Sequence, residues 1–405
     1  MGKRLVRLAP IFLMTFLPTL FVWLPYLLRL ESIWKIPLTS NGMATVVANY
    51  DGPLYIVIAK TFYNLDMISK SFSFDLPLEY YAAHFPMYPI LIFLVASVTN
   101  LFSAFSSFAG YPYAMLISTL ISSFLAMYFF NKFIKQYTSE PNALWITFVF
   151  GLLPARWLIV RSVGSPEPLF VAAIIASIYY FQNKKYWLAA VWGVVAQLTK
   201  SPGVLLFLAY GLTITAQSFK QIAISKAKAF DHILNWRAYP VVLIPLSLLG
   251  LFSLYSIRFN NFFAYFNSGD NIHLFFPPFQ VFNSSAPWVG TFWLEDIIFI
   301  YLLGTIGIVQ LIDIFMHADK KDRERHAVVM WFAIIYFVSI LFVSHRDVAR
   351  YSLPIVPFLF AAWHKFFTTK EFKIAFFIII IPIFLYSYTF ITGNTIPISD
   401  WAPLL

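Results

Sequence analysis

The sequence predicts an all-α, polytopic transmembrane protein, and three features lead to that fold class. Of the 405 residues, 60% are hydrophobic and only 11% are charged, whereas a soluble domain usually carries about 25% charged residues. The mean hydropathy is +0.74. The apolar stretches extend to about 20 residues without polar alternation, which suits membrane helices and excludes a β-barrel.

Charge and cysteine content exclude several classes of site. The chain contains no cysteine, so disulfides and thiolate metal sites are excluded. We attribute the formal net charge of +10 to cytoplasmic loops. Nucleic acid binding is not expected, because no basic domain outside the membrane exists to hold it. The apolar run from Leu8 to Leu28 is too long for the core of a signal peptide, so we expect an uncleaved first span.

The positions of the basic residues predict the topology. If every apolar run crossed the membrane, most basic connections would lie opposite the N-terminal Lys3, Arg4 and Arg7, against the positive-inside rule. These connections are Lys132/Lys135, Lys184/Lys185, Lys220 to Arg237, Lys320 to Arg325, and Lys365 to Lys373. One run must therefore fail to cross.

The segment Pro86–Phe105 is the best candidate for that run. It begins with two prolines within four residues and contains Ser97, Thr99 and Asn100, which suits a re-entrant or interfacial helix. With this segment in the first outer loop, we expect about 11 spans. The prediction is a multi-pass protein of the cell membrane, with the N-terminus in the cytoplasm and the C-terminus outside.

This topology divides the chain into two modules. Residues 1–216 form the first, with a long extracytoplasmic loop over 31–111, and residues 217–405 form the second, with an outer loop over 258–293. The few outer charges are isolated and lie beside prolines and glycines at helix ends. Charges at membrane depth cost about 2.5–3.5 kcal/mol on insertion scales and are functional candidates. We therefore expect the functional site on the extracytoplasmic side.

The first outer loop holds an acidic residue at the start of a predicted helix. Asp51 precedes Gly52 and Pro53, and proline suits the first helical turn. One interpretation is an N-cap carboxylate, which stabilises a helix by about 1 kcal/mol. The other is a carboxylate that takes a proton from a nucleophile. In the same loop, His84 is either a proton carrier or a hydrogen-bonded structural residue.

Two further turns place single charges at outer helix ends. Glu167 lies between two prolines, and Arg161 lies six residues before it. The two side chains either form a structural ion pair, or Arg161 meets an anionic group while Glu167 orders a hydroxyl-rich ligand. Lys200, in Leu198-Thr-Lys-Ser-Pro-Gly203, lies at another helix break, where a lysine costs least if it binds an anion.

The last outer turn, Ser344–Pro354, carries two arginines. Arg346 and Arg350 are spaced i, i+4 and would face the same way on a helix, where they could clamp a phosphate. Asp347 can neutralise one of them. With Lys200 and Arg161, four cations are able to converge on one phosphate. His345 and Tyr351, in the same turn, complete the set of candidate substrate-binding residues.

No competing motif appears elsewhere. The second outer loop, from Asn260 to Trp293, is rich in Phe, Asn, Ser and Pro. It suits either a sugar or lipid ligand, or simple interfacial anchoring by aromatic residues. The sequence has no zinc pattern, Walker loop, dinucleotide-binding loop or nucleophile elbow. No metal site is predicted, although a divalent metal is not excluded.

Taken in order, these turns resemble the GT-C superfamily of integral membrane glycosyltransferases, and most of all the mannosyltransferases related to glycosylphosphatidylinositol mannosyltransferase II. The resemblance covers the first half of the chain well and the second half only at its final outer turn. The matching motifs are Tyr50-Asp-Gly-Pro-Leu-Tyr-Ile-Val-Ile-Ala59, Phe85-Pro-Met-Tyr-Pro89, Ser165-Pro-Glu-Pro-Leu-Phe170, Leu198-Thr-Lys-Ser-Pro-Gly-Val-Leu205 and Arg350-Tyr-Ser-Leu-Pro354.

The resemblance implies a donor sugar carried on a polyprenyl or dolichyl phosphate and inverting transfer on the extracytoplasmic face. By position, Asp51 matches the catalytic base of such enzymes, and Glu167 matches a second acidic residue near the site. The sequence departs from the mannosyltransferase pattern at Gly164-Ser-Pro-Glu167, where Tyr-Ser/Thr-Glu-Ser is usual. Lys200 also replaces a common arginine. Mannose is the expected sugar, and the acceptor is an unidentified glycan, lipid or protein.

The charges agree with this chemistry. When a sugar–phosphate bond breaks, the phosphate moves from one negative charge toward two, so preorganised cations bind the transition state better than the ground state. The alternative is a lipid-linked sugar flippase or other membrane transporter. Transporters usually show internal repeats and interrupted helices at mid-membrane, whereas this sequence shows no repeat and groups its unusual residues on one face.

Overall fold

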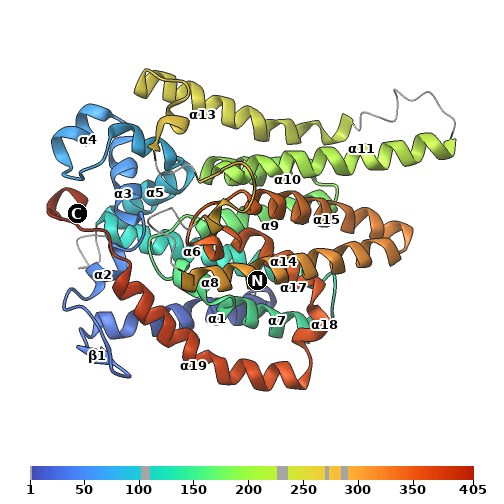
Figure 1. Cartoon of the computed structure of the whole chain (residues 1–405), viewed down its shortest axis with the longest axis horizontal. Coiled ribbons are helices and arrows are strands. Elements are labelled where there is room, and N and C mark those ends of the chain that lie inside the picture. The colour runs from blue at the N-terminus through green and yellow to red at the C-terminus, as the bar shows by residue number, and fades with distance from the viewer. Residues whose placement is uncertain (1, 102–109, 226–235, 270–272, 284–290) are drawn as a thin grey trace.

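The computed structural model describes residues 2–101, 110–225, 236–269, 273–283 and 291–405, and almost every element in them is helical (Figure 1). The described strands are β1 (Ser32–Ile33) and β2 (Ile36–Pro37), a short antiparallel hairpin in which Ser32 pairs with Pro37. The predicted all-α class is confirmed.

The helices of residues 1–225 form the first half of the fold. They are α1 (Gly2–Leu27), α2 (Met43–Val47), α3 (Gly52–Thr61), α4 (Leu65–Ser71), η1 (Leu78–Ala83), α5 (Met87–Leu101), α6 (Tyr111–Ile134), α7 (Glu140–Leu152), α8 (Ala155–Val160), α9 (Glu167–Gln182), α10 (Tyr186–Thr199), η3 (Ser201–Val204) and α11 (Leu205–Ser225).

The remaining described helices lie after residue 235. They are η4 (Trp236–Val242), α13 (Leu243–Phe259), η5 (Ala264–Asn267), η7 (Gln280–Phe282), α14 (Thr291–His317), α15 (Lys320–Leu341), α16 (Val348–Tyr351), η8 (Leu353–Ile355), α17 (Val356–Ala362), α18 (His364–Phe367), α19 (Lys370–Gly393) and η9 (Ala402–Leu404).

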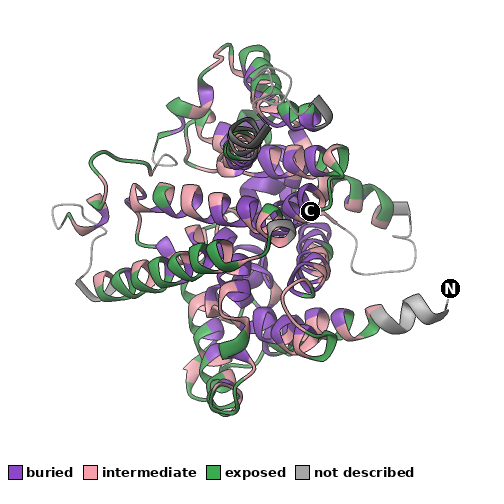
Figure 2. Ribbon diagram, turned by 90° about the vertical axis from the view of Figure 1, so that its right-hand side faces the viewer, coloured by how far each residue is buried: buried purple, intermediate pink, exposed green. Residues whose placement is uncertain are grey.

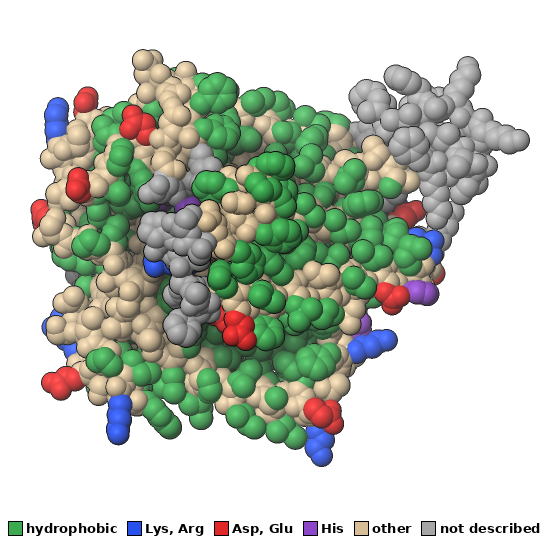
Figure 3. Space-filling view, viewed as in Figure 1, with side chains coloured by type: hydrophobic (Ala, Val, Ile, Leu, Met, Phe, Trp, Pro, Cys, Tyr) green, Lys and Arg blue, Asp and Glu red, His purple; other side chains and the backbone are tan. Residues whose placement is uncertain are grey.

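The chain is a helical membrane protein. Within the described residues, 6 helices are long and apolar enough to cross a membrane. These are Leu8–Leu27, Tyr111–Ile134, Ala238–Phe259, Leu294–His317, Asp322–Leu341 and Lys370–Gly393. Hydrophobic side chains fill the middle of the face in Figure 3, and most charged ones lie toward its two ends. This is the surface that a hydrocarbon layer around the middle of the molecule requires.

Buried residues fill the centre of the molecule (Figure 2), and the helices α6 and α9 are buried along most of their length. Helix α9 packs against α6 on one side and α10 on the other. On another side of α10, Gly193 allows α13 to approach closely, because a Cβ there would lie 2.4 Å from the Ile244 side chain of α13. The hydroxyl of Ser177 on α9 donates to the Ala189 carbonyl of α10 at 2.7 Å. The site described below is built on this central helix layer.

The predicted basic connections gather at one end of the helical body, on the right in Figure 1. Lys184 Nζ lies 3.8 Å from Glu324 Oε2, and His326 Nδ1 lies 3.2 Å from the Tyr137 hydroxyl. Residues 226–235 of the Lys220–Arg237 connection lie outside the described residues. Asp51, on the first outer loop, lies at the opposite end with α3 and α4. The membrane orientation of these two ends stays a prediction.

The described part of helix α5 is shorter than a membrane span. Its 15 residues extend about 22 Å, against about 30 Å for the hydrocarbon core. The hydroxyl of Tyr88, near its start, hydrogen-bonds to Thr119 Oγ1 of α6 at 2.6 Å. Residues 102–105 of the predicted Pro86–Phe105 segment lie outside the described residues, as do 270–272 and 284–290 of the second outer loop. The total of about 11 spans stays a prediction.

Candidate active site

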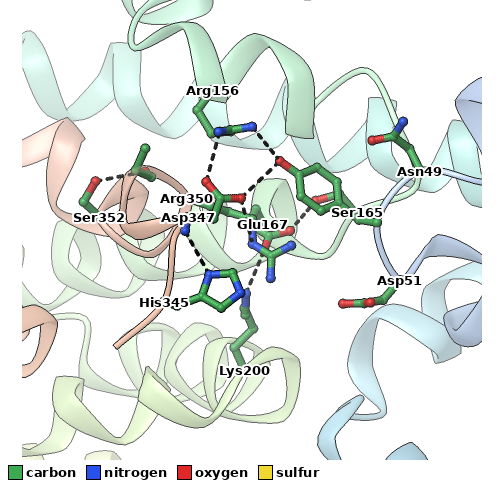
Figure 4. A network of polar contacts seen from close by, with 12 residues as sticks. Asn49, Asp51, Arg156, Ser165, Glu167, Lys200, His345, Asp347, Arg350 and Ser352 are labelled. Atoms are coloured by element: carbon green, nitrogen blue, oxygen red, sulfur yellow. Dashed lines mark hydrogen bonds and ion pairs between the residues drawn. The ribbon is translucent and has the colours of Figure 1, made fainter. Parts of the chain in front are cut away.

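Charged residues from the ends of four helices meet in one cluster (Figure 4). We call this cluster the charged cluster. Its members are Arg156 at the start of α8, Glu167 at the start of α9, Lys200 after α10, and Asp347 and Arg350 around α16. Each lies at a helix end, where the chain turns.

Glu167 lies at the centre of the charged cluster. Its side chain is only 5% exposed, and its Oε1 lies 2.7 Å from Lys200 Nζ and 3.4 Å from Arg350 Nε. The Ser165 hydroxyl donates to Oε2 of the same carboxylate. A buried carboxylate needs such partners, because an unpaired buried charge is very costly. Glu167 therefore holds Lys200 and Arg350 in place.

A second carboxylate anchors the other arginine of the cluster. Asp347 Oδ1 lies 3.1 Å from Arg156 Nε. The Tyr50 hydroxyl donates to Asp347 Oδ2 at 3.4 Å and accepts from Arg156 Nη1 at 3.2 Å. Asp347 Oδ2 is 4.0 Å from Arg350 Nε. Asp347 thus neutralises Arg156 more directly than Arg350.

Asp51 lies on the other side of the site and points toward the charged cluster (Figure 4). It is the N-cap residue of α3, and its carbonyl accepts from Leu54 N at 3.0 Å. Among the described residues, however, its carboxylate makes no capping hydrogen bond. The N-cap interpretation is therefore right for the main chain and wrong for the side chain. The carboxylate is 38% exposed, with Oδ2 4.0 Å from His84 Nε2.

His84 is buried beside Asp51. Its ring makes an edge contact with Tyr55, with centroids 4.9 Å apart, and a tilted contact with Tyr80 at 5.6 Å. Burial lowers the pKa of His84, and the nearby Asp51 carboxylate offsets this only in part. The imidazole is therefore neutral at pH 7. This packing favours the interpretation of His84 as a structural residue. Its position beside Asp51 also makes it part of the candidate site.

Arg161 is not part of the charged cluster, and the predicted ion pair with Glu167 is wrong. Its guanidinium is fully buried and donates to the carbonyls of Gly151, Thr15 and Met14. Pro18 lacks an N–H, so the Met14 carbonyl has no helical donor within α1. Arg161 therefore donates to main-chain carbonyls of α1, near Pro18, and at the end of α7, which excludes the predicted contact with an anionic ligand.

Arg346 and Arg350 do not face the same way. The helix α16 begins only at Val348, so Arg346 lies before it and the i, i+4 geometry does not apply. Arg346 is exposed, whereas the Arg350 side chain is 14% exposed and lies against the Tyr50 ring at 4.7 Å. The four predicted cations therefore do not converge. The structure brings Lys200 and Arg350 together and adds Arg156 in place of Arg161 and Arg346.

Sequence reasoning missed Arg156, although a signal for it exists. Arg156 is a charged residue in an apolar stretch just after Pro154, and Lys200 was likewise singled out as a charge close to a proline at a helix break. Its guanidinium stacks on the Phe390 ring at 3.8 Å, a contact between α8 and α19 that spacing in the sequence does not reveal.

An aromatic wall adjoins the charged cluster. The His345 ring lies 4.5 Å from that of His273 and 5.4 Å from that of Tyr351, and Lys200 Nζ lies 5.8 Å from the Tyr351 ring centre. Burial, together with the nearby His273 and Arg350, lowers the pKa of His345 to about 3. His345 is therefore neutral, and its Nδ1 accepts from the Asp347 main-chain N–H at 2.9 Å.

This arrangement is suited to an anion next to a proton acceptor. Three cations, Arg156, Lys200 and Arg350, are paired with only two carboxylates, which leaves a net positive charge. Facing them, Asp51 is a partly exposed carboxylate with no Lys or Arg side chain within ion-pair distance among the described residues, and its neighbour at 4.0 Å is the neutral His84. Among the residues that the structure describes, no group of three or more His, Asp or Glu side chains is arranged to hold a metal ion.

Comparison with known proteins gives distant similarities in fold. No family model matches the chain, and no curated protein matches it. The archaeal oligosaccharyltransferase AglB from Archaeoglobus fulgidus, solved with an inhibitory peptide and a dolichol-phosphate, is 14% identical with a TM-score of 0.48. A crystal structure of an oligosaccharyltransferase from the same organism, with zinc and sulfate, is 14% identical with a TM-score of 0.46.

The two matches differ from this chain in length. They cover 96% and 95% of this chain but only 57% and 54% of theirs, so the chain spans about half the length of these structures. At this identity, and with TM-scores below 0.5, they assign no residue and no activity to this chain. The role of the site is therefore argued below from its own geometry.

Proposed function

We propose that this protein is a glycosyltransferase that moves a sugar from a polyprenyl or dolichyl phosphate to an acceptor hydroxyl on the extracytoplasmic face of the membrane. The observation that supports this most is the position of Asp51. A partly exposed carboxylate, free of Lys and Arg partners among the described residues, faces a cluster that carries an excess of positive charge.

The charged cluster binds the phosphate of the donor. Arg350 and Lys200 flank Glu167, and Arg156 is held by Asp347. These cations are preorganised by the carboxylates, so they need little rearrangement when charge develops on the leaving phosphate. The lipid chain of the donor extends along an apolar surface such as the one in the middle of the face shown in Figure 3. A lipid-linked phosphate therefore fits both the charge and the location of the site.

The reaction is a single displacement. Asp51 takes the proton of the acceptor hydroxyl while its oxygen forms a bond to the anomeric carbon. The bond between that carbon and the phosphate oxygen breaks, and its electron pair leaves with the lipid phosphate, so the configuration inverts. General base catalysis of this kind contributes typically about 100- to 10,000-fold. Glu167 positions the phosphate-binding cations and does not take this proton, because its ion pairs occupy its carboxylate.

Mannose is the proposed sugar, on the sequence resemblance to mannosyltransferases alone. The test is transfer of label from radiolabelled polyprenyl phosphate-mannose in membranes that contain wild type, Asp51→Asn or the control Asp75→Asn. Asp75 is an exposed carboxylate of the same outer loop. We expect label in a new product with wild type and the control, and none with Asp51→Asn.

Other outcomes show which part of the proposal is wrong: the base, the donor sugar or the reaction class. If Asp51→Asn transfers label at the wild-type rate while folded, Asp51 is not the base. If wild type leaves this donor unused, the same assay with other lipid-linked sugars tests the choice of mannose. Label that crosses the bilayer without forming a product, for every donor, would identify a flippase instead.

A further inference from the structure

We infer that the segment Asn394–Leu405, which follows α19, positions Asp51 by holding the main chain just before it. We call this segment the clamp. The inference rests on the proposed function, because it assigns Asn394 as a positioning residue that acts through the catalytic base. The clamp belongs to the other end of the sequence from Asp51, and Figure 1 shows it beside α2 and α3.

Main-chain hydrogen bonds join the clamp to the residues before Asp51. Tyr50 N donates to the Asn394 carbonyl at 3.3 Å, and Ile396 N donates to the Ala48 carbonyl at 2.8 Å. Between them, Asn49 and Thr395 form an isolated antiparallel bridge. The clamp therefore pairs with residues 48–50 as a short strand would, and Asp51 is the next residue along.

Two asparagine side chains strengthen this pairing. Asn394 Nδ2 donates to Asn49 Oδ1 at 3.2 Å, and Asn49 Nδ2 donates to the Ile391 carbonyl at 2.7 Å. Asn49 is fully buried. A buried amide is stable only when its donor and acceptor both find partners, and here α19 and the clamp supply both. The Asn49–Asn394 contact therefore makes the position of residue 49 depend on the clamp.

The residue between Asn49 and Asp51 needs such support. Tyr50 has a φ of 49°, in the left-handed region, which a bulky residue adopts only where the surrounding structure holds it. The clamp accepts its N–H, and Asp347 accepts its hydroxyl at 3.4 Å. Released from the clamp, Tyr50 would relax to a common conformation, and the direction of the Asp51 side chain would change.

The clamp also holds the far end of the helix that Asp51 begins. Lys60, near the end of α3, donates from Nζ to the Pro403 carbonyl at 2.7 Å. Further along the same loop, the Ser73 and Ser399 hydroxyls lie 3.0 Å apart. Helix α3 is thus tied to the clamp at both ends. Contacts at two points restrict its rotation as well as its position, and both determine where the Asp51 carboxylate lies.

The kinetic test uses Asn394→Leu, which removes the amide and keeps a side chain of similar size. A displacement of about 1 Å at a catalytic group can cost about 100-fold, so we expect kcat to fall about 10- to 100-fold with the KM for the donor unchanged. Asn394→Gln, which keeps the amide donor, should recover part of the rate.

The matched control is Thr395→Val, a change of similar shape at the neighbouring, exposed residue. It should leave kcat unchanged. A rise in donor KM at constant kcat in Asn394→Leu would overturn the inference, because it would show that Asn394 affects binding and not the base. If Asn394→Leu fails to fold, Asn394→Ala takes its place.

A second measurement does not depend on activity. Because the chain has no cysteine, Asp51→Cys can be spin-labelled in the full-length protein as the single site. We expect its electron paramagnetic resonance spectrum to show a more mobile label with Asn394→Leu, and no change with Thr395→Val. An unchanged spectrum overturns the inference. If mobility rises but wild type transfers no sugar, the clamp stands and the proposed function fails.

Discussion

At the scale of single residues, the three carboxylates of the site differ in which side chains they contact. Glu167 and Asp347 are nearly buried and each contacts cations, whereas Asp51 is 38% exposed and lies 4.0 Å from a histidine. All three are acidic residues beside helix ends, and their sequence contexts are alike. Their roles differ because of what surrounds them, so the three should respond differently to substitution.

Replacing Glu167 should destabilise the protein. Glu167→Gln leaves Lys200 and Arg350 next to each other without their shared counterion, and breaking a buried ion pair costs about 3–5 kcal/mol. Thermal unfolding in detergent measures the loss. The control is Glu140→Gln, which breaks the exposed pair of Glu140 with Lys135, where the side chains are 61% and 35% exposed. It should cost no more than about 1 kcal/mol, and equal effects would contradict the assignment.

Replacing Asp51 should affect activity and not stability. Since no capping hydrogen bond of its carboxylate exists within the described residues, Asp51→Asn should change the free energy of unfolding by less than about 0.5 kcal/mol. The same detergent unfolding measurement checks this. A loss of 1 kcal/mol or more would mean that the carboxylate caps α3 after all.

The protonation of His345 predicts a pH dependence of stability. Its pKa is about 3 in the folded protein, against an ordinary value of 6.5. Well above pH 6.5, His345 is neutral in both the folded protein and the unfolded chain. As the pH falls from 6.5 toward 3, the unfolded chain takes up a proton that the folded protein does not, so stability falls.

The measurement is the unfolding temperature between pH 8 and pH 4. Wild type should lose stability below about pH 6.5 by up to about 1.4 kcal/mol per pH unit from this group. In His345→Asn the decline should be shallower, because this proton uptake is absent. A variant with the same slope as wild type would show that His345 does not contribute.

At the scale of elements, Arg161 joins two helices through their main chains. Its guanidinium donates to the Met14 and Thr15 carbonyls of α1 and to the Gly151 carbonyl of α7. Of these, the Met14 carbonyl has no helical donor, because residue 18 is proline. The sequence predicted a ligand-binding arginine, because it shows the charge but not which carbonyls are free. Pro18 of α1 can be read from the sequence. Nothing in the sequence, however, links it to Arg161, which lies more than a hundred positions later.

Arg161 should therefore matter for stability. In Arg161→Lys a single ammonium group cannot reach carbonyls on two helices, and each buried acceptor left without a donor costs about 1–3 kcal/mol. We expect a loss of at least about 2 kcal/mol in detergent unfolding. The exposed Arg258→Lys serves as the control. If both variants unfold alike, Arg161 does not hold α1 to α7.

At the scale of the whole molecule, the two ends of the helical body carry different chemistry. One end gathers basic loops such as those around Lys184 and Arg325, and the other holds the charged cluster and Asp51. The sequence alone sorted most of these segments into two sets, because the positive-inside rule depends only on where charges lie along the chain.

The orientation of the two ends can be tested with single cysteines in the cysteine-free chain. Asp75→Cys lies in the predicted first outer loop, and Lys184→Cys replaces a side chain that is 74% exposed at the other end. In intact cells, a maleimide that does not cross membranes should label residue 75 and reach residue 184 only after permeabilisation. The reverse pattern would place the site in the cytoplasm.

The sequence by itself determined that the protein is a helical membrane protein and that its unusual charges lie at helix ends. Hydropathy, proline positions and charge depend only on the local sequence, so they can be evaluated segment by segment without a structure. Asp51, Glu167, Lys200 and Arg350 were found in this way.

Only the tertiary structure decided which charges meet. Glu167 contacts Arg350 and Asp347 contacts Arg156, pairs separated by more than 180 positions, and the clamp reaches residues 48–50 from the far end of the chain. Such pairings depend on how helices pack against each other, and many packings satisfy the same hydropathy pattern. The physical reason is that burial selects the partners of a charge, while the sequence shows only that the charge is present.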